Sequence, residues 1–222
     1  MGTTWSILVT YRQAFLDGLL VTLELSLIVW SVGLLFGAAI GLLADRYPRK
    51  VGLPIQGLAF TLSGIPILVL LYWAHFPLQV MLNDVINPFV TASWVLALVN
   101  TFMVTDAVRN ALANFPQQYA VAARVCGMTG REIALKIKFP IVLRQLIPPV
   151  LTSQVVILQA TLFASLIGVN EIFRACQQVN ASAYKPVQIY TALGLFFLAI
   201  CLPLNGLALW FKAKYTRDLS ER

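Results

Sequence analysis

The sequence predicts an all-α membrane protein with about five transmembrane helices, and the prediction rests on composition and on the distribution of charge. Of the 222 residues, 59% are hydrophobic and 11% are charged, which is typical of membrane proteins and not of soluble ones. The basic residues lie between apolar runs of roughly 20 to 25 residues, and each run is long enough to cross a bilayer. The net charge of +7 therefore indicates basic membrane-flanking loops and no nucleic-acid partner.

The first span is expected over residues 15–44. Within it Gly33, Gly37 and Gly41 recur every four residues, a ridge that lets a second helix approach closely. Glycine is also tolerated in membrane helices without such a contact, so both interpretations stay open. Glu24 lies inside the same span, and an ionisable group at membrane depth should face protein or water instead of lipid.

The second span is expected over residues 53–73, with a kink in the middle. Gly64 and Pro66 interrupt its apolar run, and proline removes a backbone hydrogen bond and frees a carbonyl. Breaks of this kind often line a substrate cavity, although many only shape helix packing. Residues 74–88 carry no Lys or Arg and are expected to form an outside loop.

The third span is expected over residues 89–108. Asp106 and Arg109 close it with a spacing of three residues, so their side chains can pair on one face of a helix.

Residues 115–140 form the longest polar and basic stretch of the chain. Thr129 and Glu132 have the spacing of a capping box, in which each side chain accepts a hydrogen bond from a free amide at a helix start. Gly127 precedes them, where the end of another helix favours a left-handed residue. The stretch should therefore contain two short helices, over 116–126 and 130–139.

The fourth span is expected over residues 146–169, followed by an outside loop over 170–185. The fifth is expected over 187–211, with a break at Pro203. The fourth span is unusually polar, so one of its faces should look into a bundle or a cavity. Its polar residues are Thr152, Ser153, Gln154, Gln159, Thr161 and Ser165.

The positions of the cations predict the orientation. With five spans, thirteen of the sixteen Lys and Arg residues fall on one side, and Arg12, Arg174 and Lys185 fall on the other. Basic loops stay in the cytoplasm, so we expect the N-terminus outside and the C-terminus in the cytoplasm.

The stretch from 121 to 140 resembles the cytoplasmic loop of ABC importer permeases, which reads E-A-A, three residues, G, nine residues, I-x-L-P. Here Val121-Ala122-Ala123, Gly127 and Ile137-Lys138-Phe139-Pro140 keep that spacing without a gap. Val121 and Phe139 stand where the family has Glu and Leu. The resemblance implies that the loop inserts into a groove of an ATP-hydrolysing subunit. The residues implied in this contact are Ala122, Ala123, Arg124 and Gly127.

Four shorter pieces resemble the polar amino-acid branch of these permeases in the same order along the chain. They are Gly18 to Ser26, Ser63 to Leu68, Phe102 to Arg109 and Gln159 to Phe163. The resemblance implies a type I ABC importer permease, with residues 1–222 as one transmembrane domain and 115–140 as its coupling loop. Ser63, Gln159 and Ala160 replace three charged residues of the family. Either the substrate differs, or this chain is half of a heterodimer whose partner carries the substrate site; we prefer the heterodimer.

Five polar residues are candidates for the substrate path: Ser63, Asn100, Gln154, Gln159 and Thr161. For each of them an interhelical hydrogen bond without a substrate role is the simpler interpretation.

The implied function is import of a polar amino acid or related small solute across the inner membrane of a bacterium. The chain contains no G-x-x-x-x-G-K-[S/T] motif, so no P-loop binds ATP here. No cofactor is expected on this chain, and ATP and magnesium would be bound by a partner. The implied partners are a dimer of ATP-binding subunits, a second permease subunit and an extracytoplasmic solute-binding protein.

An ion-coupled transporter or channel subunit and a membrane enzyme are the alternative functions. An ion-coupled transporter or channel subunit would use Glu24 and Asp106 as ion or proton sites, but such transporters usually show internal repeats. A membrane enzyme needs clustered catalytic groups. His75 is the one histidine, and the three cysteines are too widely spaced for a metal motif.

Overall fold

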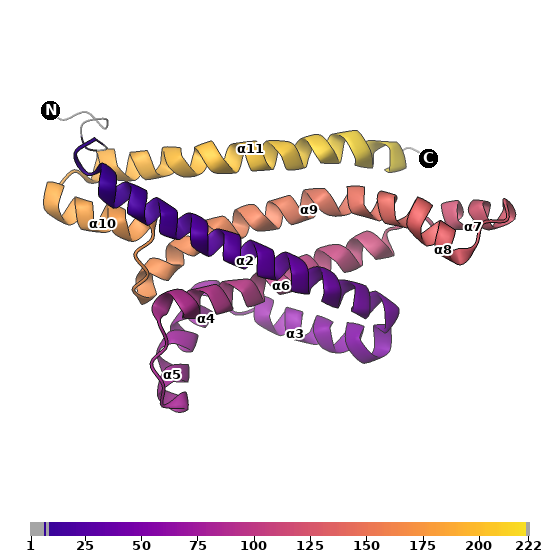
Figure 1. Ribbon diagram of the computed structural model, residues 1–222, viewed down its shortest axis with the longest axis horizontal. Coiled ribbons are helices and arrows are strands. Elements are labelled where there is room, and N and C mark those ends of the chain that lie inside the picture. The colour runs from indigo at the N-terminus through magenta and orange to yellow at the C-terminus, as the bar shows by residue number, and fades with distance from the viewer. Residues whose placement is uncertain (1–6, 8, 221–222) are drawn as a thin grey trace.

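The computed structural model is a bundle of helices and describes residue 7 and residues 9–220 (Figure 1). Within that part of the chain, four helical stretches are long and apolar enough to cross a membrane, and a bent pair of helices supplies a fifth if it is counted as one span. The expectation of an all-α protein with about five spans is confirmed. The order of the elements is α2 (Arg12–Arg46), η1 (Pro48–Gly52), α3 (Leu53–Ser63), α4 (Ile67–His75), α5 (Pro77–Leu82), α6 (Pro88–Ala113), α7 (Gln117–Val125), α8 (Gly130–Glu132), η2 (Ile133–Lys138), α9 (Phe139–Ala160), η3 (Thr161–Ile167), α10 (Ile172–Ala183) and α11 (Pro186–Ser220).

The helices α2 and α6 form the central pair of the bundle and run parallel. A Cβ atom added to Gly37 would lie 2.6 Å from the Cβ of Val104, and one added to Gly41 would lie 2.7 Å from the Cβ of Val108. Both distances are far below van der Waals contact, so the backbones approach as closely as glycine alone allows. The glycine ridge is therefore a helix-packing surface, and of the two interpretations of these glycines the first holds.

The second span is broken more sharply than the predicted kink. The stretch ending at Ser63 and the one beginning at Ile67 meet at 92°, and Pro66 has an extended backbone with φ −56° and ψ 137°. Beyond α4, the buried Gln79 of α5 holds the connection to α6, because its amide oxygen accepts from the Ile86 amide at 3.2 Å.

The predicted boundary between the coupling loop and the fourth span is wrong. Instead of ending at Phe139 and starting again at 146, one helical stretch runs from Gly130 to Ile167. Its second segment, η2, is a π-helix that ends two residues before Pro140. A π-turn widens the backbone locally, which lets the proline ring follow it without ending the helix.

Two further expectations near the C-terminus are also wrong. Residues 170–185 contain the helix α10 and are not a loop throughout; its buried residues Ile172, Ala175, Cys176 and Val179 follow a helical spacing. The helix α11 continues through Pro203, because a membrane helix tolerates the loss of one backbone hydrogen bond when the neighbouring turns stay intact.

Candidate functional site

The helix α7 and the short α8 stand at the end of the molecule opposite α10 (Figure 1). Pro116 enters α7 with an extended backbone, at φ −68° and ψ 110°. Gly127 leaves it in the left-handed conformation, at φ +80°, and the Met128 amide donates back to the Ala123 carbonyl at 3.1 Å. The left-handed glycine with this hydrogen bond ends α7 as predicted.

The two faces of α7 differ in burial. Ala120 and Ala123 pack inward beside Phe115 and Ile133, whereas Val121 is 58% exposed and Val125 is 84% exposed. Of the four residues predicted to contact an ATPase, Ala122, Arg124 and Gly127 lie on the surface, and Ala123 is buried in the loop itself. The side chain of Ala123 therefore supports the position of α7 from behind.

The capping box at the start of α8 is confirmed. The Thr129 hydroxyl accepts from the Glu132 amide at 3.4 Å, and the Glu132 carboxylate accepts from the Thr129 amide at 3.0 Å. The hydrogen bond from the Thr129 amide is the main reason why the pKa of Glu132 is lowered to about 2. A hydrogen bond from Lys136 at 3.1 Å is the second cause. The carboxylate is thus charged throughout the physiological range, and the turn between α7 and α8 is fixed by polar contacts.

Ion pairs lie where the loop meets the rest of the bundle. Lys138 lies 3.7 Å from Asp45 at the end of α2. Arg109 lies 3.8 Å from Asp106, as its spacing predicted. The Gln56 side chain also faces Arg109, and with its amide oxygen on that side it accepts from the guanidinium at 3.1 Å. Lys138 thus joins the loop to the end of α2, and Gln56 joins α3 to the last part of α6, before the loop begins.

Two of the five candidate path residues meet in the core. The Asn100 amide nitrogen donates to the Gln154 oxygen at 3.1 Å, and the Gln154 amide nitrogen donates back at 3.3 Å. Asn100 also donates to the Val29 carbonyl at 3.1 Å. Asn100 is fully buried and Gln154 nearly so. This pair therefore joins α2, α6 and α9 in the way the simpler interpretation expected.

The other three candidates make their hydrogen bonds elsewhere. Thr161 is fully buried and donates to the Leu158 carbonyl of its own helix at 2.7 Å. Gln159 is exposed on α9, with its nitrogen 3.9 Å from the Cys201 sulfur. Ser63 is exposed at the end of α3, next to the sharp break before α4. Of the five candidates, only Ser63 and Gln159 are exposed in this structure.

The model of the family described as "binding-protein-dependent transport system inner membrane component" matches residues 33–217. The chain belongs to this family. It is a permease subunit of an ABC importer, a multi-pass membrane protein, and the ATPase activity of such importers resides on a separate subunit. This membership favours the importer over the ion-coupled transporter or channel.

Named relatives and solved structures agree with this membership. The permease is 28% identical over 216 residues to the histidine/lysine/arginine/ornithine transport system permease protein HisQ of Salmonella typhimurium, covering 93% of this chain and 95% of HisQ. It is 28% identical over 212 residues to the glutamine transport system permease protein GlnP of Escherichia coli, covering 92% and 94%. Its fold matches a crystal structure of an amino acid ABC transporter with histidines, at a TM-score of 0.83 and 21% identity over 93% of this chain and 96% of that one.

A buried polar joint between α2 and α10 was missed by the sequence interpretation. Glu171 is fully buried, and its carboxylate accepts from the amides of Phe173 and Arg174 at 2.8 and 2.9 Å. The Ile172 amide donates to the Thr22 hydroxyl at 3.0 Å. A Cβ on Gly18 would lie 2.9 Å from the Ala175 Cβ. Gly18 and Thr22, from the Gly18 to Ser26 motif, therefore form the surface of α2 on which α10 packs. The sequence signal for this joint was an acidic residue followed by apolar residues at helical spacing.

Replacing Asn100 by Leu is expected to destabilise the permease by about 2 kcal/mol, because the side-chain amide of Gln154 would stay buried without its partner. The Val29 carbonyl would also lose the hydrogen bond that Asn100 adds to its helical one. The double variant with Gln154→Leu should cost less than the sum of the two single changes. Thermal unfolding of all three variants in one detergent measures the difference. Additive losses would show that the two amides do not interact.

The stability of the α2–α10 joint is expected to fall between pH 5 and pH 8. Burial raises the pKa of Glu171 from its ordinary 4.5 to about 7. The folded state thus holds the proton more tightly than the unfolded state. That contribution is complete below about pH 4.5 and is lost as the pH rises through about 7.

Hydrogen exchange of residues 172–183, corrected for the intrinsic effect of pH, measures this loss. The variant Glu171→Gln should give a flat profile, whereas Asp84→Asn, on the exposed α5–α6 connection, should keep the slope. A slope that survives in Glu171→Gln would assign it to another group.

Proposed function

We propose that this permease carries a polar amino acid or a related small solute across the bacterial inner membrane, powered by ATP hydrolysis on a dimer of separate subunits. The names of HisQ and GlnP support an amino-acid substrate. The thirteen-to-three division of the cations supports an outside N-terminus and a cytoplasmic C-terminus. The single transmembrane domain, residues 1–222, would work with a second permease, in a heterodimer by preference, and with an extracytoplasmic solute-binding protein.

The exposed apolar face of α7 is the observation that carries the proposal. Val121 and Val125 are exposed one turn apart on α7, beside the exposed Arg124. Arg131 and Lys136 are exposed on the segment that follows. An exposed apolar strip with a polar rim on a protruding helix is typical of a protein docking site. The ATP-binding subunit would bury these two valines, while Ala122 lets its surface come close to the helix backbone.

The break between α3 and α4 supports a polar substrate. Residues 64–66 are exposed and not helical, yet they lie between two apolar helices. Backbone of this kind persists at membrane depth only where it is buried by protein or lines a water-filled cavity. Ser63, whose hydroxyl donates to the Phe60 carbonyl at 2.8 Å, would lie at the edge of that cavity.

Substitution of Val125 by Glu is expected to lower co-purification of the ATP-binding subunit at least about tenfold, because it places a charge in the apolar centre of the docking face. Val85→Glu is the matched control, since Val85 is 93% exposed on the α5–α6 connection; it should retain the ATPase within about twofold. The measurement is a mild-detergent pull-down of the tagged permease from its native membrane. Equal recovery of the ATPase in both variants would refute docking through α7.

A further inference from the structure

Three cations lie together at the turn between α2 and α3. Arg46 ends α2, and Arg49 and Lys50 follow it in η1. All three side chains are exposed. The neighbouring acid, Asp45, pairs with Lys138 instead. No carboxylate in the described part of the chain forms an ion pair with any of the three cations, so the turn carries three positive charges that the chain itself does not neutralise.

The charges of this turn differ from those around it in two ways. Three other cations near this end of the bundle do form ion pairs within the chain: Arg109, Lys136 and Lys138. In addition, Arg49 and Lys50 lie near the start of the continuous helical stretch Pro48–Ser63, whose first turn contains no acidic residue. The dipole of a helix repels cations at its N-terminus. An anion from outside the chain would offset both the missing ion pairs and this repulsion.

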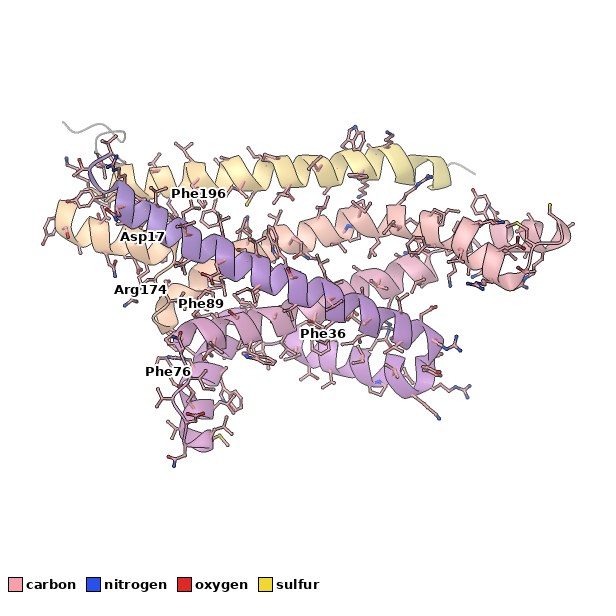
Figure 2. All side chains as sticks on the ribbon, viewed as in Figure 1. Asp17, Phe36, Phe76, Phe89, Arg174 and Phe196 are labelled. Carbon is pink, nitrogen blue, oxygen red and sulfur yellow. The ribbon has the colours of Figure 1, made fainter. Side chains whose placement is uncertain are left out.

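Exposed apolar side chains flank the turn on both helices. On α2, Leu42 is 58% exposed, and the exposed apolar surface extends back to Phe36, which Figure 2 labels. On α3, Leu53 is 62% exposed. Between them Tyr47 is exposed and has the guanidinium of Arg46 over its ring, 5.7 Å from the centroid. Leucines followed by a tyrosine and cations are typical of a membrane–water interface, which places the turn at the level of the lipid headgroups.

The docking face of α7 lies farther from the membrane than this turn. The ion pair between Lys138 and Asp45 sets the end of α2 level with Lys138. The helical stretch that contains Lys138 begins eight residues earlier, at Gly130, which is about 12 Å farther out along its axis. Figure 1 likewise shows α7 and α8 extending beyond the turn between α2 and α3. A subunit docked on α7 is therefore a less suitable source of the anion than the lipid that surrounds the turn.

An anionic phospholipid matches both the charge and the apolar surface. Its headgroup phosphate would lie against the cations, and its acyl chains would cover the leucines on either side. Basic residues next to a membrane span attract anionic lipids in this way. A zwitterionic lipid fits less well, because its own ammonium group offsets the charge of its phosphate. Soluble phosphate has the charge but no chains to hold it at this level.

We infer that the Arg46–Lys50 turn binds the headgroup of an anionic phospholipid, with the phosphate against Arg49 and Lys50 and the acyl chains along the exposed leucines. This inference rests on the proposed function, which places the turn at the cytoplasmic leaflet, and adds a lipid ligand to it.

The test compares two photoreactive lipids that share their acyl chains and differ in the headgroup. The importer, assembled with its partners, is reconstituted in phosphatidylcholine vesicles with a trace of photoreactive phosphatidylglycerol or photoreactive phosphatidylcholine. After illumination, mass spectrometry of the permease peptides locates the adducts. Phosphatidylglycerol should label residues 42–53 at least about fivefold more than phosphatidylcholine, since each cation near the surface favours an anionic lipid by about that factor.

Two double variants show whether the preference belongs to this turn. Arg49→Gln with Lys50→Gln should lower the preference for phosphatidylglycerol to within about twofold. The matched control is Lys212→Gln with Lys214→Gln. It removes the same charge from exposed positions near the end of α11, which lies at the same end of the bundle (Figure 1). The control should keep the preference at residues 42–53 within about twofold of the parent value.

Four results would overturn the inference. Equal labelling of the parent by the two lipids would mean that the headgroup is not recognised. An equal loss in both double variants would indicate attraction to the overall charge of this side. Loss of the preference in excess inorganic phosphate, but not in sodium chloride of equal ionic strength, would assign the turn to soluble phosphate. Labelling that appears only after removal of the ATP-binding subunit would assign it to a protein contact.

Solute import is measured in the same vesicles and is read separately. Import that depends on ATP, without a headgroup preference, refutes the lipid site alone. Import that does not depend on ATP refutes the proposed function. The comparison of the two lipids on the parent needs no substitution, so it decides the question even if a double variant does not fold.

Discussion

Replacement of Gly127 by Val is expected to uncouple transport from ATP hydrolysis while the bundle stays folded. Gly127 has a φ of +80° and no atom within 4 Å of the position of an added Cβ. The added side chain meets no obstacle, and the cost is the left-handed backbone, about 1–2 kcal/mol and more for a β-branched residue. The turn should relax toward negative φ and re-aim α7. Substrate-stimulated ATPase activity of the reconstituted importer should fall at least about tenfold.

Two control variants separate the backbone effect from the added volume. Gly127→Asn should retain coupling within about threefold, because asparagine tolerates the left-handed region. Gly130→Val adds the same side chain three residues later, where an added Cβ also meets nothing within 4 Å and φ is ordinary; it should stay near the parent activity. If Gly127→Val transports normally, the angle between α7 and α8 has no part in coupling.

Replacement of Gly37 by Val is expected to have the largest effect on stability. Its Cβ would lie 2.6 Å from the Val104 Cβ and 2.8 Å from the Thr101 carbonyl oxygen. Neither α6 atom can swing aside as a flexible side chain would, so α2 and α6 must separate. We expect a loss of about 3 kcal/mol, which corresponds to a fall of about 6–12 °C in the midpoint of thermal unfolding for a chain of this size.

The matched control for Gly37→Val is Gly194→Val in α11. It makes the same change inside another candidate membrane span, where an added Cβ has no neighbour within 4 Å. Its unfolding midpoint should stay within about 2 °C of the parent, since only helix propensity changes. If the unfolding midpoint fell equally in both variants, the effect would come from replacing glycine within a helix. The close packing of α2 against α6 would then not be the reason why Gly37 matters.

Hydropathy and local hydrogen-bonding rules predicted the features that depend on few neighbours. The long apolar run of α2, the break at Pro66, the left-handed Gly127 and the Thr129–Glu132 capping box all follow from residues close together in the sequence. The apolar run is visible in composition alone. The other three are fixed by backbone chemistry within one or two turns, so a single sequence contains the information.

The errors arose where tertiary contacts decide. Pro140 was interpreted as a helix end, but the π-turn before it carries the helix onward. The segment beginning at Ile172 was assigned to an outside loop, yet burial of one face against α2 makes it a helix. In the candidate site, Asn100 and Gln154 are 54 residues apart in the sequence. No local sequence pattern predicts that their side-chain amides form hydrogen bonds with each other.

The unbroken helical stretch from Gly130 to Ile167 has a mechanical consequence. It connects residues 115–140 to the far end of the bundle as a rod of about 55–60 Å. When a rod without a joint tilts about one end, the displacement of its other end is proportional to its length. A tilt of about 10° therefore moves the far end by roughly 10 Å. Movement at the Gly130 end would thus reach the Ile167 end directly. The softest points of the rod would be its π and 3₁₀ segments, η2 and η3, where hydrogen-bond geometry is least regular.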